Sequence, residues 1–403
     1  MSGEGGSAVV TLEGVDIARL DRFDDGGVFE LQFDERYRRQ SPALRAVLGQ
    51  FYEDRLLDRV RTESFPAWFA NVLPERGPYL ASIARELGVD VNDHWELLCA
   101  LGGDLPGAVT VRSTSSSAVR RQPAAPPQRQ LPLSLGVSLA GVQAKLSIHD
   151  DDDGKLVVPV ASENGQAIVK FHDPRHLRIV HVEYATTVWA KACGIVVPDI
   201  RRVDTRTIEG LPPKLFDLGD GAAFLTRRFD RTEGRRIHME DFAQLFDRPP
   251  AEKYDEERRP LHYEEVGAVV AGLCDDNAFF RFLDQLVFCF ICGNTDAHLK
   301  NFSLLYPDGV HADLSPAYDL VAAVVYERHA DEMALQLGGT KKLAEIDARS
   351  FDRLCNFAVL ADEARNRVAE VAQRARERFA DVKDAFSADE RRRLKAHLAR
   401  LKL

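Results

Sequence analysis

The sequence predicts an α+β protein in which a β-rich N-terminal half precedes a mainly helical C-terminal half. Residues 8–112 alternate short strand-like and helical runs, residues 134–231 add further strand-like runs, and residues 232–403 mostly show apolar residues at helical spacing. Residues 113–133 are rich in Ser, Pro, Ala and Gln, which is typical of a flexible linker. We therefore expect an N-terminal α+β subdomain (1–112), this linker, a mixed β/α lobe (134–231) and a helical lobe (232–403).

The composition is that of an ordinary soluble protein with a substantial core. The chain has 403 residues, of which 45% are hydrophobic and 29% are charged. A formal net charge of −10 and a pI of about 5.6 argue against broad binding of nucleic acid or anionic membranes by the chain itself. The opening residues, MSGEGGSAVV, lack the pattern of a secretory signal, and no apolar run approaches membrane-spanning length. The expected compartment is the cytoplasm.

The six cysteines are scattered and mostly flanked by apolar residues, as expected for reduced thiols in a core. Two of them have C-x-x-C spacing, but they fall on an apolar helix without a second ligand pair, which disfavours a metal or redox site. The cysteines are Cys99, Cys193, Cys274, Cys289, Cys292 and Cys355.

The N-terminal subdomain is expected to combine three strands with three helices. Alternation of apolar and polar residues predicts the strands, and apolar residues at helical spacing predict the helices, two of which would end at Gly88 and Gly102. The expected strands are 9–12, 27–33 and 107–111, and the expected helices are 65–74, 79–87 and 93–101.

The mixed lobe begins with two strand-like runs separated by small residues, within 134–148. Backbone N–H groups of such a loop can face a phosphate. Val142 and Gln143 stand where a Walker A loop requires Lys and Ser/Thr, so a P-loop NTPase is disfavoured. The acidic run 150–153 is expected to be a solvated hairpin tip, because the ligand spacing of a calcium loop is missing.

A single lysine, Lys170, lies on the apolar strand 166–171, and a helix that opens at Glu183 and ends at Gly194 follows. A cation on a rigid strand can pair the α- and β-phosphates of a nucleotide, and a strand lysine before a helix glutamate is the ion-pair order of a kinase N-lobe. The alternative, a charge that protects a sheet edge from aggregation, fits the strand equally well.

The stretch 222–231, AAFLTRRFDR, begins as an apolar strand and turns sharply polar. The pattern fits the crossover between two lobes, where backbone groups would hold an adenine. The chain beyond it is mainly helical, with expected helices at 240–246, 263–273, 361–383 and 388–401, the last two with solvated Arg/Glu-rich faces.

The stretch 283–303, LDQLVFCFICGNTDAHLKNFS, carries the strongest chemical signal. An apolar helix stops at Gly293 and leads directly into a polar loop in which Asp296 and Asn301 have the D-x-x-x-x-N spacing of a kinase catalytic loop. In such a loop the Asp orients the attacking hydroxyl and the Asn holds a magnesium ion. Asx residues also cap turns, but a very apolar helix leading into a charged loop favours function. Asp319 offers a second carboxylate for the metal. These residues predict a kinase, with ATP and Mg²⁺ as its cofactors.

With these residues in place, the chain resembles the HipA family of bacterial toxin serine/threonine kinases over nearly its whole length. The joint order of several modest motifs carries the resemblance. The N-terminal unit, including residues 69–74, resembles the small subdomain that full-length members place before the kinase core. The motifs are SLAGVQAK (138–145), the strand with Lys170, AKACGIVVPD (190–199), RFDR (228–231), NTDAHLKNFS (294–303) and PAYD (316–319).

The resemblance implies a two-lobed, protein-kinase-like fold and assigns roles within it. Asp296 would be catalytic, Lys170 and Lys300 would offset phosphate charge, and Asn301 and Asp319 would hold Mg²⁺. Ser138 would be an autophosphorylation site whose modification ejects the phosphate loop and inactivates the enzyme. His298, Arg228 and Phe229 complete the expected nucleotide site, with His298 more structural than catalytic. The phosphate loop would be Leu139, Ala140, Gly141, Val142, Gln143 and Ala144.

The resemblance also implies partners. A small HipB-like helix-turn-helix antitoxin would neutralise the kinase and tether it to operator DNA, so that DNA contact is indirect and no membrane is involved. The substrate would be a protein of translation, such as an aminoacyl-tRNA synthetase, and the physiological setting would be a toxin–antitoxin system linked to persistence. Two alternatives stay open: a catalytically silent pseudokinase that acts with the antitoxin, and a small-molecule kinase of the aminoglycoside-phosphotransferase type.

Overall fold

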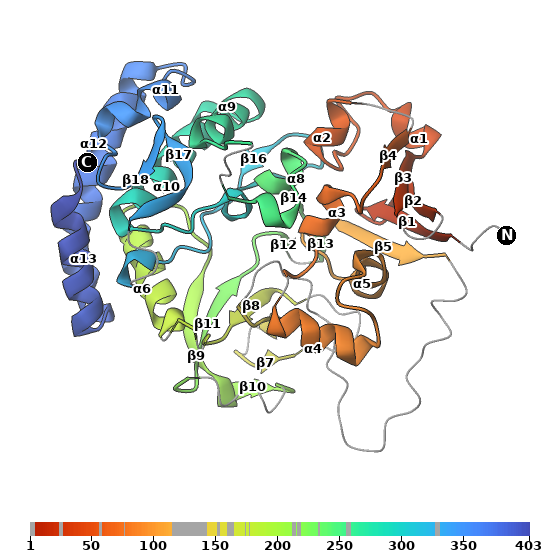
Figure 1. Cartoon of the computed structure of the whole chain (residues 1–403), viewed down its shortest axis with the longest axis horizontal. Coiled ribbons are helices and arrows are strands. Elements are labelled where there is room, and N and C mark those ends of the chain that lie inside the picture. Colours follow the sequence, from red (N-terminus) through yellow and green to blue (C-terminus); the bar gives the residue numbers. More distant parts are fainter. Residues whose placement is uncertain are drawn as a thin grey trace. The chain divides into compact units, whose positions relative to one another are not determined.

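The fold is α+β, as predicted (Figure 1). The computed structural model describes residues 5–23, 27–55, 59–75, 77–114, 143–150, 154–158, 165–173, 175–176, 178–211, 215, 219–232, 234–254, 259–326 and 331–403. The chain forms two compact units, the first from Met1–Phe171, Val203–Pro250 and Tyr306–Val310, the second from His172–Arg202, Ala251–Leu305 and His311–Leu403. The expected linker falls almost entirely outside the described residues, and the four-part division remains a prediction.

A five-stranded antiparallel sheet, in the order β4-β3-β2-β1-β5, forms the N-terminal part of the first unit. The buried residues alternate along β1, which explains why the pattern was readable there. Two strands escaped the sequence analysis, β2 and β4. Between β1 and β2 the turn residues Glu13 and Gly14 both have positive φ, the geometry of a tight hairpin. The strands are β1 (Gly6–Leu12), β2 (Val15–Phe23), β3 (Val28–Phe33), β4 (Arg59–Thr62) and β5 (Val109–Ser113).

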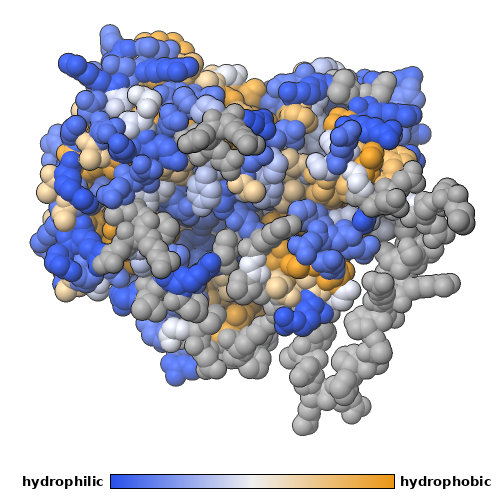
Figure 2. Space-filling model, in the orientation of Figure 1, coloured by the Kyte–Doolittle hydropathy of each residue, from blue (hydrophilic) through white to orange (hydrophobic). Residues whose placement is uncertain are grey.

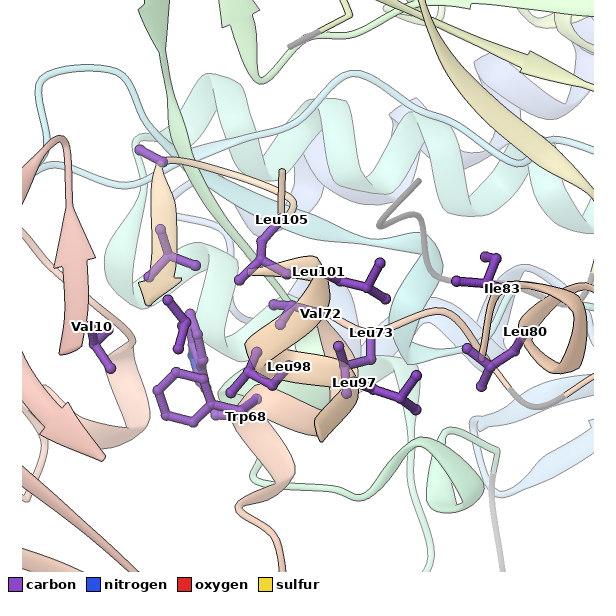
Figure 3. Packing of buried hydrophobic residues seen from close by; sticks show 14 of the residues in the cluster. Val10, Trp68, Val72, Leu73, Leu80, Ile83, Leu97, Leu98, Leu101 and Leu105 are labelled. Atoms are coloured by element: carbon purple, nitrogen blue, oxygen red, sulfur yellow. The ribbon is translucent and has the colours of Figure 1, made fainter. Parts of the chain in front are cut away.

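The three expected helices of this part are present, and their apolar faces build the core in Figure 3 around Trp68, Leu98 and Leu101. Asp93 begins the last of them by accepting hydrogen bonds from the backbone N–H groups of Trp95 and Glu96. The helices of this part are α1 (Glu35–Arg38), α2 (Gln50–Glu53), α3 (Ala67–Asn71), α4 (Pro78–Leu87) and α5 (His94–Leu101).

A second sheet has the order β10-β7-β6-β8-β11-β9. The expected helix at 240–246 is wrong at its start: residues 238–241 form a strand, and only then does a short helix begin, where Asp241 and Gln244 make a capping box. These elements are β6 (Lys145–Asp150), β7 (Leu156–Val157), β8 (Ala167–Lys170), β9 (Ile200–Asp204), β10 (Ile208–Glu209), β11 (Ala222–Arg227), β12 (Arg231–Thr232), β13 (Arg235–Arg236), β14 (His238–Asp241) and α8 (Phe242–Leu245).

A buried ion cluster, formed by Asp104, Arg228, Asp230, Arg231 and Arg236, joins the two sheet-bearing parts of the first unit. The guanidinium of Arg228 donates two hydrogen bonds to the Asp230 carboxylate (2.9 and 2.8 Å), and Arg231 links Asp230 to Asp104 (2.7 and 2.9 Å). Burial alone would raise the pKa of Asp230, but the charges of Arg228 and Arg231 outweigh it and lower that pKa. The cluster therefore stays ionised although it is buried.

Gly107 lets the backbone approach this cluster. Its N–H donates to Asp230 (2.9 Å) and its carbonyl accepts from Arg231 and Arg236 (both 3.0 Å). Its φ is +74°, and a Cβ at this position would lie 2.8 Å from the backbone nitrogen of Met239. A side chain at residue 107 would therefore be both strained and obstructed.

The second unit is mainly helical and is centred on α10 (Asp276–Cys292), against which α12 (Ala361–Val382) and α9 (Tyr263–Leu273) pack. Trp189 donates to the carbonyl of Ala375 (2.8 Å), and Arg367 pairs with the largely buried Asp284 (2.6 Å). The helix expected from Glu183 begins four residues earlier. The remaining elements are α6 (Ile179–Ala192), α11 (Asp352–Cys355), α13 (Ala388–Arg400), β15 (Ser303–Tyr306), β16 (Asp313–Leu314), β17 (Glu332–Leu337) and β18 (Thr340–Lys342).

All six cysteines are free, and four of them are buried, in line with the expected reduced thiols. Burial raises the pKa of the Cys289 thiol on α10 to about 12, so it is held as an inert thiol at neutral pH. Among the described helices, none combines the length and the apolar character that crossing a membrane requires. On the face shown in Figure 2, hydrophilic residues predominate over the described surface and the apolar patches are small.

Candidate active site

The predicted catalytic loop begins where α10 ends. Gly293 ends the helix with φ +70°, and a Cβ there would lie 2.4 Å from the side chain of Val324. The carbonyl of Gly293 accepts a hydrogen bond from the Val324 N–H (3.1 Å), which fixes the segment after Asp319 against the end of the helix. The sequence prediction of this helix end is confirmed.

Asp296 is the only exposed residue between residues 282 and 306, all of which are described. Its neighbours Thr295 and Ala297 are buried, and so are Asn294 and His298. A loop that buries its polar residues but presents one carboxylate at the surface is not explained by solvation of that loop. Asp296 is therefore the residue of this loop that is accessible to a ligand.

Asn301 is held to the same loop by its own side chain. Its Nδ2 donates to the backbone carbonyl of Asp296 (2.9 Å), and its backbone N–H donates to the carbonyl of His298 (2.9 Å). The hydroxyl of Tyr263 on α9 stabilises this loop by donating a hydrogen bond to the carbonyl of Ala297 (2.8 Å). Because Nδ2 is engaged, the amide flip is fixed and Oδ1 is the atom left to coordinate a cation.

Asp319 has a positive φ of +54°, which is uncommon outside glycine. Asn294 of the predicted catalytic loop contacts this position, since the Nδ2 of Asn294 donates to the backbone carbonyl of Asp319 (3.3 Å). Such backbone strain persists only where the surroundings enforce it, and it often marks a functional position. The second unit thus brings the loop of Asp296 and Asn301 together with that of Asp319.

Lys300 is buried, and its backbone carbonyl accepts a hydrogen bond from the Tyr318 hydroxyl (2.8 Å). The same hydroxyl lies 2.5 Å from Ser303 Oγ. Tyr318, next to Asp319, is therefore a second link between the two loops. The charge-offsetting role of Lys300 remains a prediction.

The residues present fit a magnesium ion. Asn301 would contribute an amide oxygen and the half-buried Asp319 a carboxylate, and Mg²⁺ takes oxygen ligands, usually one or two carboxylates together with substrate phosphates. Asn294 Oδ1 and Thr295 Oγ1, both buried in this loop, have no hydrogen-bond partner among the described residues. Oxygen-rich surroundings of this kind suit a hard cation and its ligands.

Tyr254 is a site residue to which the sequence analysis assigned no role. Its hydroxyl donates to Asp296 Oδ1 (2.8 Å), and its ring packs edge-on against the His298 ring, with centroids 5.1 Å apart. Tyr254 precedes Asp296 by 42 residues, so no local spacing could reveal the contact. His298 was expected in the nucleotide site; the structure places it buried against Tyr254.

Lys170 lies on β8 of the first unit, directly opposite Lys145 on β6 and Phe224 on β11. Residues in register across neighbouring strands point to the same face, so the two lysines share it. Both are buried, and Lys170 Nζ lies 5.8 Å from the Phe224 ring. Two ammonium groups on one face concentrate positive charge there. The sequence analysis quoted Lys145 in a motif without giving it a role, because the strand register was unknown.

The other residues predicted to bind the nucleotide fall into three groups: two lie beside β8, two lie at residues 228 and 229, and the rest are outside the described residues. Gln143 Nε2 donates to the carbonyl of Phe171 (2.6 Å), and the Ala144 carbonyl accepts from the Phe171 N–H (3.0 Å), so both flank the end of β8. The Arg228 side chain belongs to the buried ion cluster, and the Arg228 N–H donates to the Gln166 carbonyl (2.8 Å). The assignment of Arg228 and of the partly exposed Phe229 to a nucleotide site stays a prediction. Outside the described residues lie Ser138, Leu139, Ala140, Gly141 and Val142.

Comparison with known families decides the relationship. Residues 8–112 match the family model of the HipA N-terminal domain, and residues 137–385 match that of the HipA-like C-terminal domain. The chain belongs to the HipA family. Together the two models cover most of the described structure of this HipA-family chain, and the intervening residues correspond to the expected linker.

Comparisons with individual proteins are consistent with membership of this family. The chain is 35% identical over 388 residues to "Putative kinase Y4dM" of Sinorhizobium fredii, covering 93% of this chain and 91% of that one. It is 31% identical over 308 residues to "Putative kinase Y4mE" of the same organism, covering 70% of each chain. Among solved structures, a chain of the Shewanella oneidensis MR-1 toxin–antitoxin complex of HipA, HipB and operator DNA matches with a TM-score of 0.70 at 20% identity, over 98% of this chain and 96% of that one. This last match shows the HipA-like fold.

Proposed function

We propose that this chain is an ATP- and Mg²⁺-dependent serine/threonine protein kinase, the toxin of a toxin–antitoxin pair. The observation that carries the proposal is the catalytic loop: Asp296 stands exposed on a buried loop whose Asn301 is hydrogen-bonded to it. The kinase names of its relatives support the same activity.

Catalysis would rest on positioning and charge neutralisation. Asp296 orients the acceptor hydroxyl and takes its proton, while the buried Lys300 offsets charge on the transferring group. Asn301 and Asp319 hold Mg²⁺, which when bound neutralises negative charge on the nucleotide phosphates. In the first unit, Lys170 and Lys145 supply positive charge for the phosphates, joined by the backbone of residues 139–144.

The partner would be a HipB-like helix-turn-helix antitoxin. The Shewanella oneidensis neighbour was solved with HipB and operator DNA, and the acidic net charge of this chain favours DNA contact through such a partner rather than directly. The substrate class would be a protein of translation, such as an aminoacyl-tRNA synthetase, and the enzyme would work in the cytoplasm. Ser138 would be the site at which it phosphorylates and inactivates itself.

The direct test is phosphate transfer from γ-labelled ATP by the purified full-length chain, with Mg²⁺ or with EDTA. We expect Mg²⁺-dependent labelling of the chain, lost in Ser138→Ala, and labelling of bacterial proteins by both forms. ATP binding without transfer would indicate a pseudokinase, and transfer only to metabolites would indicate a small-molecule kinase. Either result would overturn the proposal.

The lysine pair gives a separate expectation for nucleotide binding. Lys145→Met should weaken ATP affinity about ten- to a hundredfold, since a hydrogen bond to a charged group contributes about 1.5–3 kcal/mol. Lys155→Met is the matched control, because the Lys155 side chain is 53% exposed and pairs with Glu209 at the surface. Calorimetric titration with ATP measures both. If the two variants bound ATP with equal affinity, Lys145 would have no role in binding the phosphates, and that role would fall to Lys170 alone.

A further inference from the structure

The exposed carboxylate of Asp296 accepts a hydrogen bond from the Tyr254 side chain. Within the described part of the chain, no other side chain donates to this carboxylate. Oδ1 of Asp296 accepts from the Tyr254 hydroxyl at 2.8 Å. Each carboxylate oxygen can accept about two hydrogen bonds, but Oδ2 accepts none from a described residue, which favours Oδ2 as the oxygen for an incoming hydroxyl. The tyrosine thus determines which side of Asp296 can face the acceptor.

The Tyr254 ring is held on more than one side. The buried His298 packs edge-on against it, and the Nζ of the buried Lys253 lies 5.3 Å from its centroid. The backbone around it is also anchored, because the carbonyl of Lys253 accepts a hydrogen bond from the Leu299 N–H (3.3 Å). These contacts hold the partly exposed ring with its hydroxyl at Asp296.

We propose that Tyr254 is a positioning residue for phosphoryl transfer: its hydroxyl fixes the rotamer of Asp296 so that Oδ2 receives the acceptor hydroxyl. The inference rests on the proposed kinase function. The hydrogen bond removes rotational freedom from an exposed carboxylate that the loop itself does not restrain, and misplacement by about 1 Å can reduce a rate by two orders of magnitude. His298, expected in the nucleotide site, acts here as the support of this tyrosine.

The test is Tyr254→Phe, which keeps the ring and its packing on His298 and removes only the hydroxyl. We expect kcat for transfer to fall about ten- to a hundredfold, the range for a hydrogen bond to a charged group, with the KM for ATP unchanged. Tyr184→Phe is the matched control, since the Tyr184 ring on α6 packs against the guanidinium of Arg202 on β9 and takes no part in the site. Its kcat should equal that of the wild type.

A double-mutant cycle with Asp296→Asn separates positioning from a general structural effect. The loss caused by Tyr254→Phe should shrink when Asp296 is already replaced, because the two side chains act as a unit. Additive losses would overturn the positioning role, and so would an unchanged or raised kcat for Tyr254→Phe. Phosphate found on Tyr254 by mass spectrometry would identify the hydroxyl as an acceptor instead and would also overturn it.

Failure of the proposed function gives a different result. A wild-type chain that transfers no phosphate from ATP removes the kinase assignment and this inference with it. Wild-type transfer that Tyr254→Phe leaves untouched removes only the inference, and the kinase assignment stands.

Discussion

Asp296→Asn is expected to lower phosphoryl transfer by about a hundred- to ten-thousandfold while leaving ATP affinity within about twofold of the wild type, since a positioned acid–base group contributes a factor of this size. The variant keeps the shape of the side chain but removes its charge and its ability to take a proton. The backbone carbonyl of residue 296, which holds Asn301, is unaffected, so the metal ligands should stay in place.

The rate would be measured from labelled ATP and the affinity by equilibrium titration on the same preparations. Asp362→Asn is the control, because the Asp362 side chain is almost fully exposed at the start of α12 and pairs only at the surface with Arg365. It should transfer phosphate at the wild-type rate. Transfer by Asp296→Asn at the rate of this control would remove the catalytic role of Asp296.

Asp230→Asn should destabilise the first unit by about 3–5 kcal/mol, the range for removing one partner from a buried ion pair. The change leaves Arg228 and Arg231 buried with only Asp104 as a countercharge. The substitution also weakens the hydrogen bond from the Gly107 N–H to the side chain of residue 230. That bond links the loop after α5 to residues 228–231, which carry the rest of the cluster.

Urea unfolding followed by tryptophan fluorescence measures this change, because the buried Trp68 and Trp95 belong to the first unit. The matched control is Glu209→Gln, which breaks an exposed pair with Lys155 in the same unit and should leave the unfolding curve where it is. An equal, small effect of both variants would mean that the buried cluster contributes no more than a surface pair does.

The sequence was most informative where the chemistry is local. Short segments contain the apolar run before Gly293, the spacing from Asp296 to Asn301 and the lysine on β8. The structure then places the loop of Asp296 and Asn301 next to that of Asp319. Helix limits were predicted closely for α9 and α13, because amphipathic periodicity and capping residues act over a few turns.

Errors arose where tertiary contacts override local preference. The helix expected at 240–246 starts later, because residues 240 and 241 belong to β14, a strand that includes the buried residues His238 and Glu240. Glu240 accepts hydrogen bonds from Tyr306, Trp68 and the Gln50 N–H, none of which is near it in sequence. Burial raises its pKa to about 7 against the effect of those donors.

By itself the sequence determined the α+β class, the HipA-type motif order and the carboxylate and amide on which the kinase proposal rests, since each depends on residue identity and short spacing. Only the tertiary structure decided that Lys145 shares a face with Lys170, that Arg228 belongs to a buried ion cluster and that Tyr254 binds Asp296. These facts depend on strand register and on contacts between residues far apart in the chain. Such contacts form only when folding brings distant segments together, and no short window of sequence contains that information.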